Sequence, residues 1–272
     1  LSPADALAAW DLSGPIRTSP DAGLINHTFL VGAPTVAVLQ WLNPIFRPEV
    51  NLDIDAVTLR LTAHGLTTPR VLATRTGTSF IADDDASWRV LSFVPGRTVH
   101  RIASHRMAFE GGRLVGRFHS ALDGWRHPQH APRRDVHDTP ARMRDLSAAL
   151  ESADGHALEV AARAFGELIL KDWQTWDGPL ALPDRTCHGD LKISNLRFAE
   201  HSDDAICLID LDTVGPMPLA CELGDAWRSW CNPAGEDAPD EARFDLEIFS
   251  ASAKGFLETT PPLEAIERSS LA

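Results

Sequence analysis

The feature that most restricts the fold is a change of pattern at Pro95-Gly96. Before it, β-branched and aromatic runs predict strands at residues 26–32, 35–43, 71–76 and 88–94. The first two runs flank a short Gly-Ala-Pro turn, which is typical of a hairpin. Residues 48–64 have apolar side chains at helical spacing and are followed by Gly65, so they predict a helix.

After Pro95-Gly96 the pattern is mainly helical. Apolar residues recur on one face of residues 104–122, and residues 141–153 and 156–174 predict two more helices. The polar, Pro- and His-rich residues 123–140 predict a surface loop. Strands at residues 196–199 and 205–212 predict a late hairpin, and helices resume near Glu222 and Asp240.

These patterns predict an α+β fold with two lobes. The first domain, residues 1–95, would be a small antiparallel-sheet lobe. The second, residues 96–272, would be a larger helical lobe.

The composition argues against several classes of partner. A chain of 272 residues with 44% hydrophobic residues can bury a substantial core. Its net charge of −13 disfavours nucleic acid and anionic membranes as partners, because both require a basic face. No apolar run reaches the roughly 18 residues of a membrane helix. The four cysteines form no C-x-x-C pair, and no signal peptide is evident, so we expect a cytoplasmic protein, either monomer or homodimer.

The clearest chemical signal is the run His-Gly-Asp-Leu-Lys-Ile-Ser-Asn at residues 188–195, followed by Asp210 at the end of an apolar strand. An Asp, an Asn five residues later and a second Asp beyond one hairpin are typical of phosphoryl-transfer loops. Asp190 would orient an acceptor hydroxyl and take its proton, while Asn195 and Asp210 would provide oxygen ligands for Mg²⁺. Taken singly, each residue is also compatible with a turn or a cap.

Two further residues of this run have predicted roles. His188 would fix the loop by hydrogen bonds. Lys192, one of three lysines, follows the proposed base by two residues, where its ammonium could offset charge on the transferring phosphoryl group. The alternative for Lys192 is a solvated surface lysine.

His127 and His130 form an H-x-x-H pair in the predicted loop after residue 122. A zinc site needs further ligands, and no Cys or carboxylate pattern in the sequence completes the set. The sequence therefore favours a solvated polar loop.

The run at 188–195 resembles the aminoglycoside phosphotransferase and choline kinase branch of the protein-kinase-like fold. Residues 209–230, with Asp-Leu-Asp-Thr-Val and Gly-Asp-x-x-Arg, look closer to bacterial N-acetylhexosamine 1-kinases. Residues 23–31 resemble their glycine-loop strand, and residues 92–99 their hinge. The resemblance implies ATP- and Mg²⁺-dependent phosphorylation of a hydroxyl on a small molecule, with a hexosamine-like sugar favoured.

The resemblance also implies that residues 1–95 bind nucleotide, that residues 96–272 carry the catalytic loop and the acceptor site, and that particular residues form these sites. The residues that would meet the nucleotide are Gly23, Asn26, Gln40, Ser92, Phe93 and Val94. Asp212 and Arg228 match family positions and are assigned to the acceptor, and Asp225 is assigned to bracing the catalytic loop. For Asp212, a role at the metal, at the sugar or in stabilising the turn remains open.

Two features depart from the usual kinase pattern. No lysine precedes Lys171, so the third-strand lysine is replaced by Gln40, and Arg47 or Arg89 could compensate. The helix carboxylate that usually pairs with that lysine could be Glu49, Asp53 or Asp55. The glycine loop at Gly23 is also thin. A nucleotide-binding pseudokinase or regulatory protein is therefore the alternative of another class, and an aminoglycoside, choline or homoserine-type kinase is the alternative within the fold.

Overall fold

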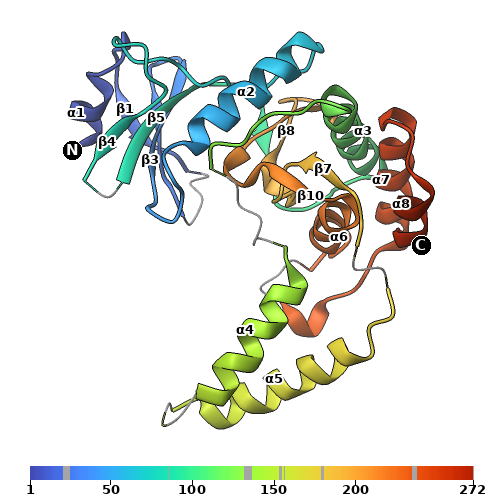
Figure 1. Ribbon diagram of the computed structural model, residues 1–272. Helices are drawn as coiled ribbons and strands as arrows, with labels where there is room; N and C mark the ends of the chain where they lie inside the picture. Colours follow the sequence, from blue (N-terminus) through green and yellow to red (C-terminus); the bar gives the residue numbers. More distant parts are fainter. Residues whose placement is uncertain are drawn as a thin grey trace.

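The computed structural model describes residues 1–20, 25–84, 86–131, 137–152, 155, 157–178, 181–234 and 238–271. An antiparallel sheet forms the N-terminal region, and helices with two small sheets form the C-terminal region (Figure 1). This arrangement confirms the predicted α+β class. Among the described residues, no helix combines the length and the apolar character that crossing a membrane requires.

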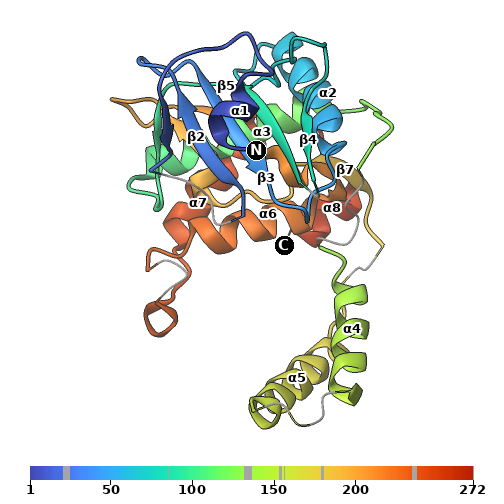
Figure 2. The same cartoon turned by 90° about the vertical axis from the view of Figure 1, so that its left-hand side faces the viewer.

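The N-terminal sheet has five strands in the order β1-β2-β3-β5-β4. Its elements are α1 (Pro3–Leu7), β1 (Ile16–Thr18), β2 (His27–Val31), β3 (Ala37–Leu42), β4 (Ile81–Asp83) and β5 (Ala86–Ser92). The predicted hairpin is confirmed as β2 and β3, which pair antiparallel. Helix α1 lies against one face of the sheet (Figure 2), where Trp10 is buried with Leu39 and Trp88.

The strand predicted at residues 71–76 is wrong. Only an isolated bridge between Val71 and Leu91 forms there. The Thr74 hydroxyl lies 2.8 Å from the Thr78 hydroxyl, and the Thr74 backbone N–H donates to the Thr78 carbonyl at 2.8 Å. A local turn thus takes the groups that a sheet ladder would need.

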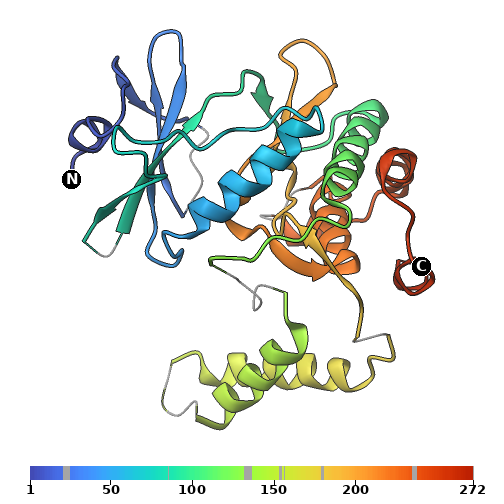
Figure 3. The ribbon, with the colours of Figure 1, turned by 45° about the horizontal axis from the view of Figure 1, so that its top comes forward.

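Helix α2 (Val50–Ala63) lies between the five-stranded sheet and the C-terminal helices (Figure 3). Its apolar stripe of Val50, Ile54, Val57 and Leu61 is buried in the same core as residues of α3 (His105–Leu122). Because this core extends across residues 42–66 and the C-terminal region, the domain boundary at 95/96 stays a prediction.

The C-terminal region contains the remaining elements. They are β6 (Arg97–Thr98), α3, α4 (Thr139–Ser152), α5 (Glu159–Gln174), β7 (Asp184–Cys187), β8 (Leu196–Phe198), β9 (Ala205–Leu208), β10 (Gly215–Pro218), α6 (Leu219–Trp230), α7 (Leu246–Thr259) and α8 (Ala265–Ser270), with short 3₁₀ turns η1 (Ile193–Asn195), η2 (Leu211–Thr213) and η3 (Pro239–Glu241). Strands β6, β8 and β9 form one sheet, and β7 pairs with β10. The late hairpin is confirmed as β8 and β9.

Helices α3 and α7 are packed backbone to backbone. A Cβ added to Gly112 would lie 2.0 Å from the Ser252 carbonyl oxygen, and one added to Gly255 would lie 2.0 Å from the Phe109 carbonyl oxygen. Only glycine permits this approach. In contrast, α4 and α5 form a hairpin that extends away from the body (Figures 1 and 2), and Gly166 is its one buried residue among those described.

Candidate active site

The loop at residues 188–195 begins where β7 ends, at the buried His188. The His188 ring donates through Nε2 to the Ile209 carbonyl at 2.9 Å, and its Nδ1 accepts from the Asp190 N–H at 3.3 Å. Gly189 has φ of +83°, and a Cβ there would lie 2.6 Å from the Thr213 carbonyl oxygen. The loop conformation therefore requires glycine at this position.

Asp190, Lys192 and Asn195 lie together on this loop. Lys192 Nζ is 2.7 Å from Asp190 Oδ2, and the Asn195 amide donates to Asp190 Oδ2 at 3.0 Å and to the Asp190 carbonyl at 2.8 Å. Partial burial lowers the pKa of Lys192, but the ion pair with Asp190 outweighs it and the net pKa lies above the usual value. The Asp190 side chain stays 32% exposed, so a reactant can reach it.

Asp210 follows β9 and is close to Asn195, whose carbonyl accepts from the Ile209 N–H at 2.9 Å. Its φ of +64° is left-handed. Burial, and then the charge of Asp212, raise the pKa of Asp210 to about 6. Within the described part of the chain, no hydrogen-bond donor meets its carboxylate. A cation would relieve this environment, and a carboxylate beside an amide oxygen suits Mg²⁺.

Glu222, on α6, is a functional residue that the sequence reasoning missed. Its carboxylate accepts from the backbone N–H groups of His188 and Gly189, both at 2.8 Å, and it is 1% exposed. Burial raises its pKa, but His119, His188 and these N–H groups outweigh burial, so the net pKa lies below the usual value. Glu222 thus holds the start of the loop, and no motif spacing marks it.

The residues assigned to the nucleotide lie in or beside the N-terminal sheet. Gly23 lies outside the described residues. The Asn26 amide donates to Asp212 Oδ2 at 2.7 Å and accepts from the Asn43 N–H at 3.0 Å. The Gln40 amide donates to the Thr28 hydroxyl at 3.0 Å. Asn26 and Gln40 are therefore engaged in the protein's own hydrogen bonds.

The hinge residues begin with Ser92, the last residue of β5. The backbone N–H of Ser92 donates to the Arg70 carbonyl at 2.8 Å, and that of Phe93 donates to the Val36 carbonyl at 3.2 Å. The Val94 carbonyl accepts from Arg197 at 3.3 Å. Arg197 belongs to β8, so it ties this segment to the hairpin that follows the loop. The nucleotide contacts of Ser92, Phe93 and Val94 stay a prediction.

Asp212 is placed differently from its assignment. Arg89 donates to both of its oxygens, at 2.5 and 3.0 Å, and Asn26 donates to Oδ2. The Asp212 side chain is 2% exposed. Because both oxygens are engaged and buried, we reassign Asp212 from acceptor binding to stabilisation of the turn.

Arg228 and Asp225 lie on α6, and an Arg228 NH2 to Asp225 Oδ1 distance of 3.1 Å pairs them. Arg228 borders a cavity of about 590 Å³. The residues that line it are Gly224, Trp227, Arg228, Asn232, Ala242, Arg243 and Phe244. The bracing role of Asp225 stays a prediction.

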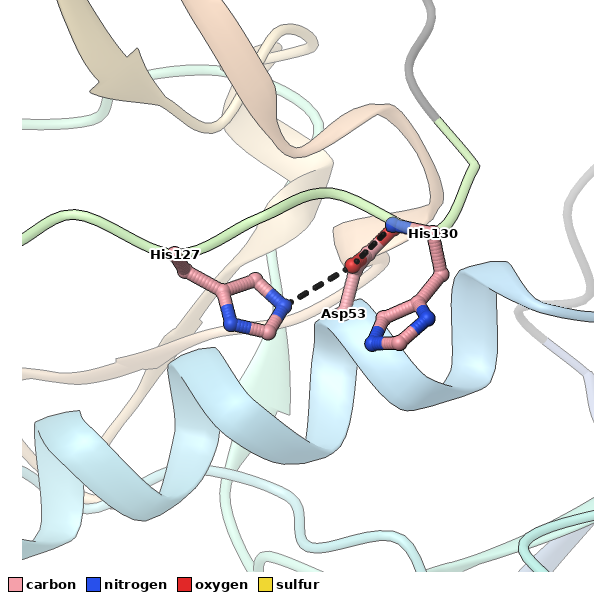
Figure 4. Close-up of side chains that lie close together, drawn as sticks. All are labelled: Asp53, His127 and His130. Carbon is pink, nitrogen blue, oxygen red and sulfur yellow. Dashed lines mark hydrogen bonds and ion pairs between the residues drawn. The ribbon is translucent and has the colours of Figure 1, made fainter.

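The H-x-x-H pair has the carboxylate that the sequence did not reveal (Figure 4). Ligand atoms of Asp53, His127 and His130 lie within 4.8 Å of one another. However, Asp53 already accepts from His127 Nε2, from the His130 N–H and from the Ala131 N–H, each at 2.9 Å. The arrangement anchors the loop on α2, while His130 is exposed and His127 partly exposed, as expected for a surface loop.

Comparison with solved structures supports the same fold. An amicoumacin kinase, hAmiN, in complex with AMP-PNP, Ca²⁺ and Ami is 15% identical with a TM-score of 0.67, and the match covers 97% of this chain and 81% of that one. An aminoglycoside phosphotransferase from Alicyclobacillus acidocaldarius is 16% identical, with a TM-score of 0.61 and coverage of 95% and 78%. A microcompartment-associated aminopropanol kinase is 19% identical, with a TM-score of 0.63 and coverage of 98% and 82%. These likenesses confirm the predicted protein-kinase-like fold.

The sequence itself also matches a known family. Residues 18–255 match the family described as "Phosphotransferase enzyme family" (APH). This match confirms the predicted enzyme class, a small-molecule phosphotransferase. With the loop geometry above, it leads to one conclusion: the chain belongs to the phosphotransferase enzyme family.

Proposed function

We propose that the protein is an ATP- and Mg²⁺-dependent kinase that phosphorylates a hydroxyl of a hexosamine-like sugar. The observation that carries this proposal is the hydrogen bonding of the loop at residues 188–195. The Asn195 amide donates to Asp190 Oδ2 at 3.0 Å, and the Asn195 carbonyl accepts from the N–H of the residue before Asp210 at 2.9 Å. A candidate base and a candidate oxygen ligand thus share one loop, and the second candidate ligand follows a residue bonded to it.

In this mechanism Asp190 Oδ2 orients the acceptor hydroxyl and takes its proton as the oxygen attacks the γ-phosphorus of ATP, whose bond to the bridging oxygen breaks so that ADP leaves. Lys192 moves its ammonium from the ion pair with Asp190 toward the phosphoryl oxygens, where it offsets developing charge. Asn195 would bind the metal through Oδ1, since its amide nitrogen faces Asp190. Asp210 would supply a carboxylate oxygen. Mg²⁺, when bound, neutralises charge on the phosphates.

Similar proteins support the choice of nucleotide and metal. The amicoumacin kinase is described with AMP-PNP and Ca²⁺, and an APH(2") structure is described with GDP and kanamycin. The Ca²⁺ described for the amicoumacin kinase is a hard divalent cation, the kind that the Asn–Asp oxygen pair of this chain would suit.

The cavity beside Arg228 supports a sugar as acceptor. Trp227 and Phe244 offer aromatic surface for the C–H face of a sugar ring, while Arg228, Asn232 and Arg243 offer donors for its hydroxyls and amide. Among the described residues that line the cavity, none is acidic.

The test is an acceptor screen with coupled ADP detection. We expect N-acetylhexosamines to give ADP release above the acceptor-free rate, with kanamycin, choline and homoserine near that rate. Activity with one of the latter only would replace the sugar and keep the kinase. MgATP binding by calorimetry without ADP release for any acceptor would favour the pseudokinase instead.

A further inference from the structure

Kinases usually have a lysine on the third strand, but in this protein the positively charged side chain beside that position belongs to the neighbouring strand β5. Gln40 on β3 occupies the place of the usual lysine, and its direct partner across the β3–β5 pairing is Arg89. The Arg89 Nε donates to Gln40 Oε1 at 2.9 Å. The neutral side chain and the charged one therefore meet at one register position.

Arg89 connects three elements that are distant in sequence. Its NH1 donates to Asn51 Oδ1 on α2 at 3.3 Å, and its guanidinium binds both oxygens of Asp212 on η2. The α2 side chain that binds Arg89 is thus the amide of Asn51, where the sequence had led us to expect a carboxylate. One of the expected carboxylates, Asp53, binds the loop at residues 127–131 instead. Arg89 thus links the sheet and α2 to residues 210–213, which we call the metal loop because they include the proposed ligand Asp210.

Burial makes this pairing informative. The Arg89 and Asp212 side chains are 1% and 2% exposed. A buried ion pair contributes little net stability, because desolvation offsets the attraction, yet it fixes geometry strongly when the arginine is bidentate. Asp212 follows Asp210 by two residues, and Asp210 has a left-handed backbone. Fixing Asp212 therefore fixes the direction of the Asp210 carboxylate relative to the sheet.

We propose that Arg89 is the positioning residue that aligns the metal loop with the nucleotide-binding sheet, acting through Asp212. Arg89 lies on β5, beside a third strand that has no lysine, and it connects the sheet and α2 to the metal loop. This inference rests on the proposed kinase function. Because Arg89 is buried against Asp212, it does not contact phosphate. Its loss should therefore affect turnover and Mg²⁺ dependence more than nucleotide affinity.

The experiment compares Arg89→Lys with a matched control, Arg185→Lys. Arg185 is also bidentate, binding Glu267 at 2.5 and 2.7 Å, but it links β7 to α8. We expect Arg89→Lys to lower kcat about 100-fold and to raise the half-saturating Mg²⁺ concentration several-fold, with the KM for ATP within about threefold, since small misplacements carry such costs. Arg185→Lys should leave kcat and Mg²⁺ dependence unchanged.

A double-mutant cycle isolates the path through Asp212. Asp212→Asn should reproduce the loss of kcat, and adding Arg89→Gln should lower it little further, because both changes break one interaction. The double variant removes both charges of the buried pair, so neither is left unpaired. It therefore keeps the test valid if Arg89→Lys does not fold. Wild-type kcat in the double variant, or fully additive losses, would overturn the proposal.

The KM for ATP separates positioning from direct contact. A loss expressed mainly in that KM would mean that Arg89 binds phosphate itself and would also overturn the proposal. If the wild-type protein phosphorylates no acceptor, the kinase proposal fails on its own. The Mg²⁺ affinities of the same variants, measured by calorimetry, then still decide the role of Arg89: equal affinities in all of them reject it.

Discussion

The loop at residues 188–195 with Asp210 and the polar cluster of Asn26, Gln40, Arg89 and Asp212 use similar residue types in opposite ways. In the cluster, Asp212 has both oxygens bound by Arg89 and Asn26. Two residues earlier, no described donor meets the carboxylate of Asp210, and its pKa rises to about 6. Satisfied polar groups hold the structure, whereas the group left unsatisfied is the one available for a ligand.

The most severe test of this contrast is Asp190→Asn. The amide cannot take the hydroxyl proton, so we expect kcat to fall roughly 10³-fold while MgATP affinity stays near the wild-type value. Steady-state kinetics and calorimetry measure the two quantities. Asp11→Asn, on a side chain that is 85% exposed, is the control. Full turnover in the Asp190 variant would remove this residue from the chemistry.

The next test removes the anchor of the loop. In Glu222→Gln the amide can accept from only one of the two N–H groups of His188 and Gly189, so one buried donor loses its partner. We expect the free energy of unfolding to drop by about 2 kcal/mol, measured by urea denaturation. A loss below about 0.5 kcal/mol would show that water replaces the carboxylate there.

A smaller loss of stability is expected for Asp53→Asn. The carboxylate accepts from two backbone N–H groups and from His127, and the amide can keep only part of this set. We expect a decrease of about 1 kcal/mol in the free energy of unfolding and no change in Mg²⁺ dependence. If added Zn²⁺ raises the melting temperature of the wild type but not of this variant, the three side chains bind metal as well.

The smallest expected effects depend on pH. They arise from Asp210 and Glu222, two carboxylates whose pKa values are shifted in opposite directions. The folded-state pKa of Asp210 is about 6, above its ordinary value, so protonation competes with Mg²⁺ below pH 6. We expect apparent Mg²⁺ affinity to level off above pH 6 and to fall up to about tenfold per unit below it. Calorimetry between pH 5 and 8 measures this, and a flat profile would contradict it.

The pKa of Glu222 is shifted in the opposite direction from that of Asp210. Its folded-state pKa lies below the ordinary value, so its contribution to stability is complete above the unfolded-state pKa and is lost as the pH falls through the folded-state pKa. Asp210 without metal has the other sign, since protonation from pH 6 downward favours the folded state. Urea denaturation of Glu222→Gln should therefore lack part of the acid-induced loss seen in the wild type.

Local periodicity was sufficient for most elements. The apolar stripe of α2 and the hairpin of β2 and β3 follow directly from spacing. The strand at residues 71–76 did not form, because Thr74 closes a turn with Thr78. Side-chain competition of this kind depends on the geometry of the turn, which a count of β-branched residues does not record.

The sequence alone identified the loop at residues 188–195 as the proposed catalytic loop, since the hydrogen bonds between Asn195 and Asp190 lie within one short segment. Tertiary structure alone decided the partners of Asp212, Glu222 and Asp53. Arg89 and Asp212 are 123 positions apart, and the donors to Glu222 are 33 and 34 positions away. Buried polar groups must find partners wherever packing brings them, and chain spacing does not encode that choice.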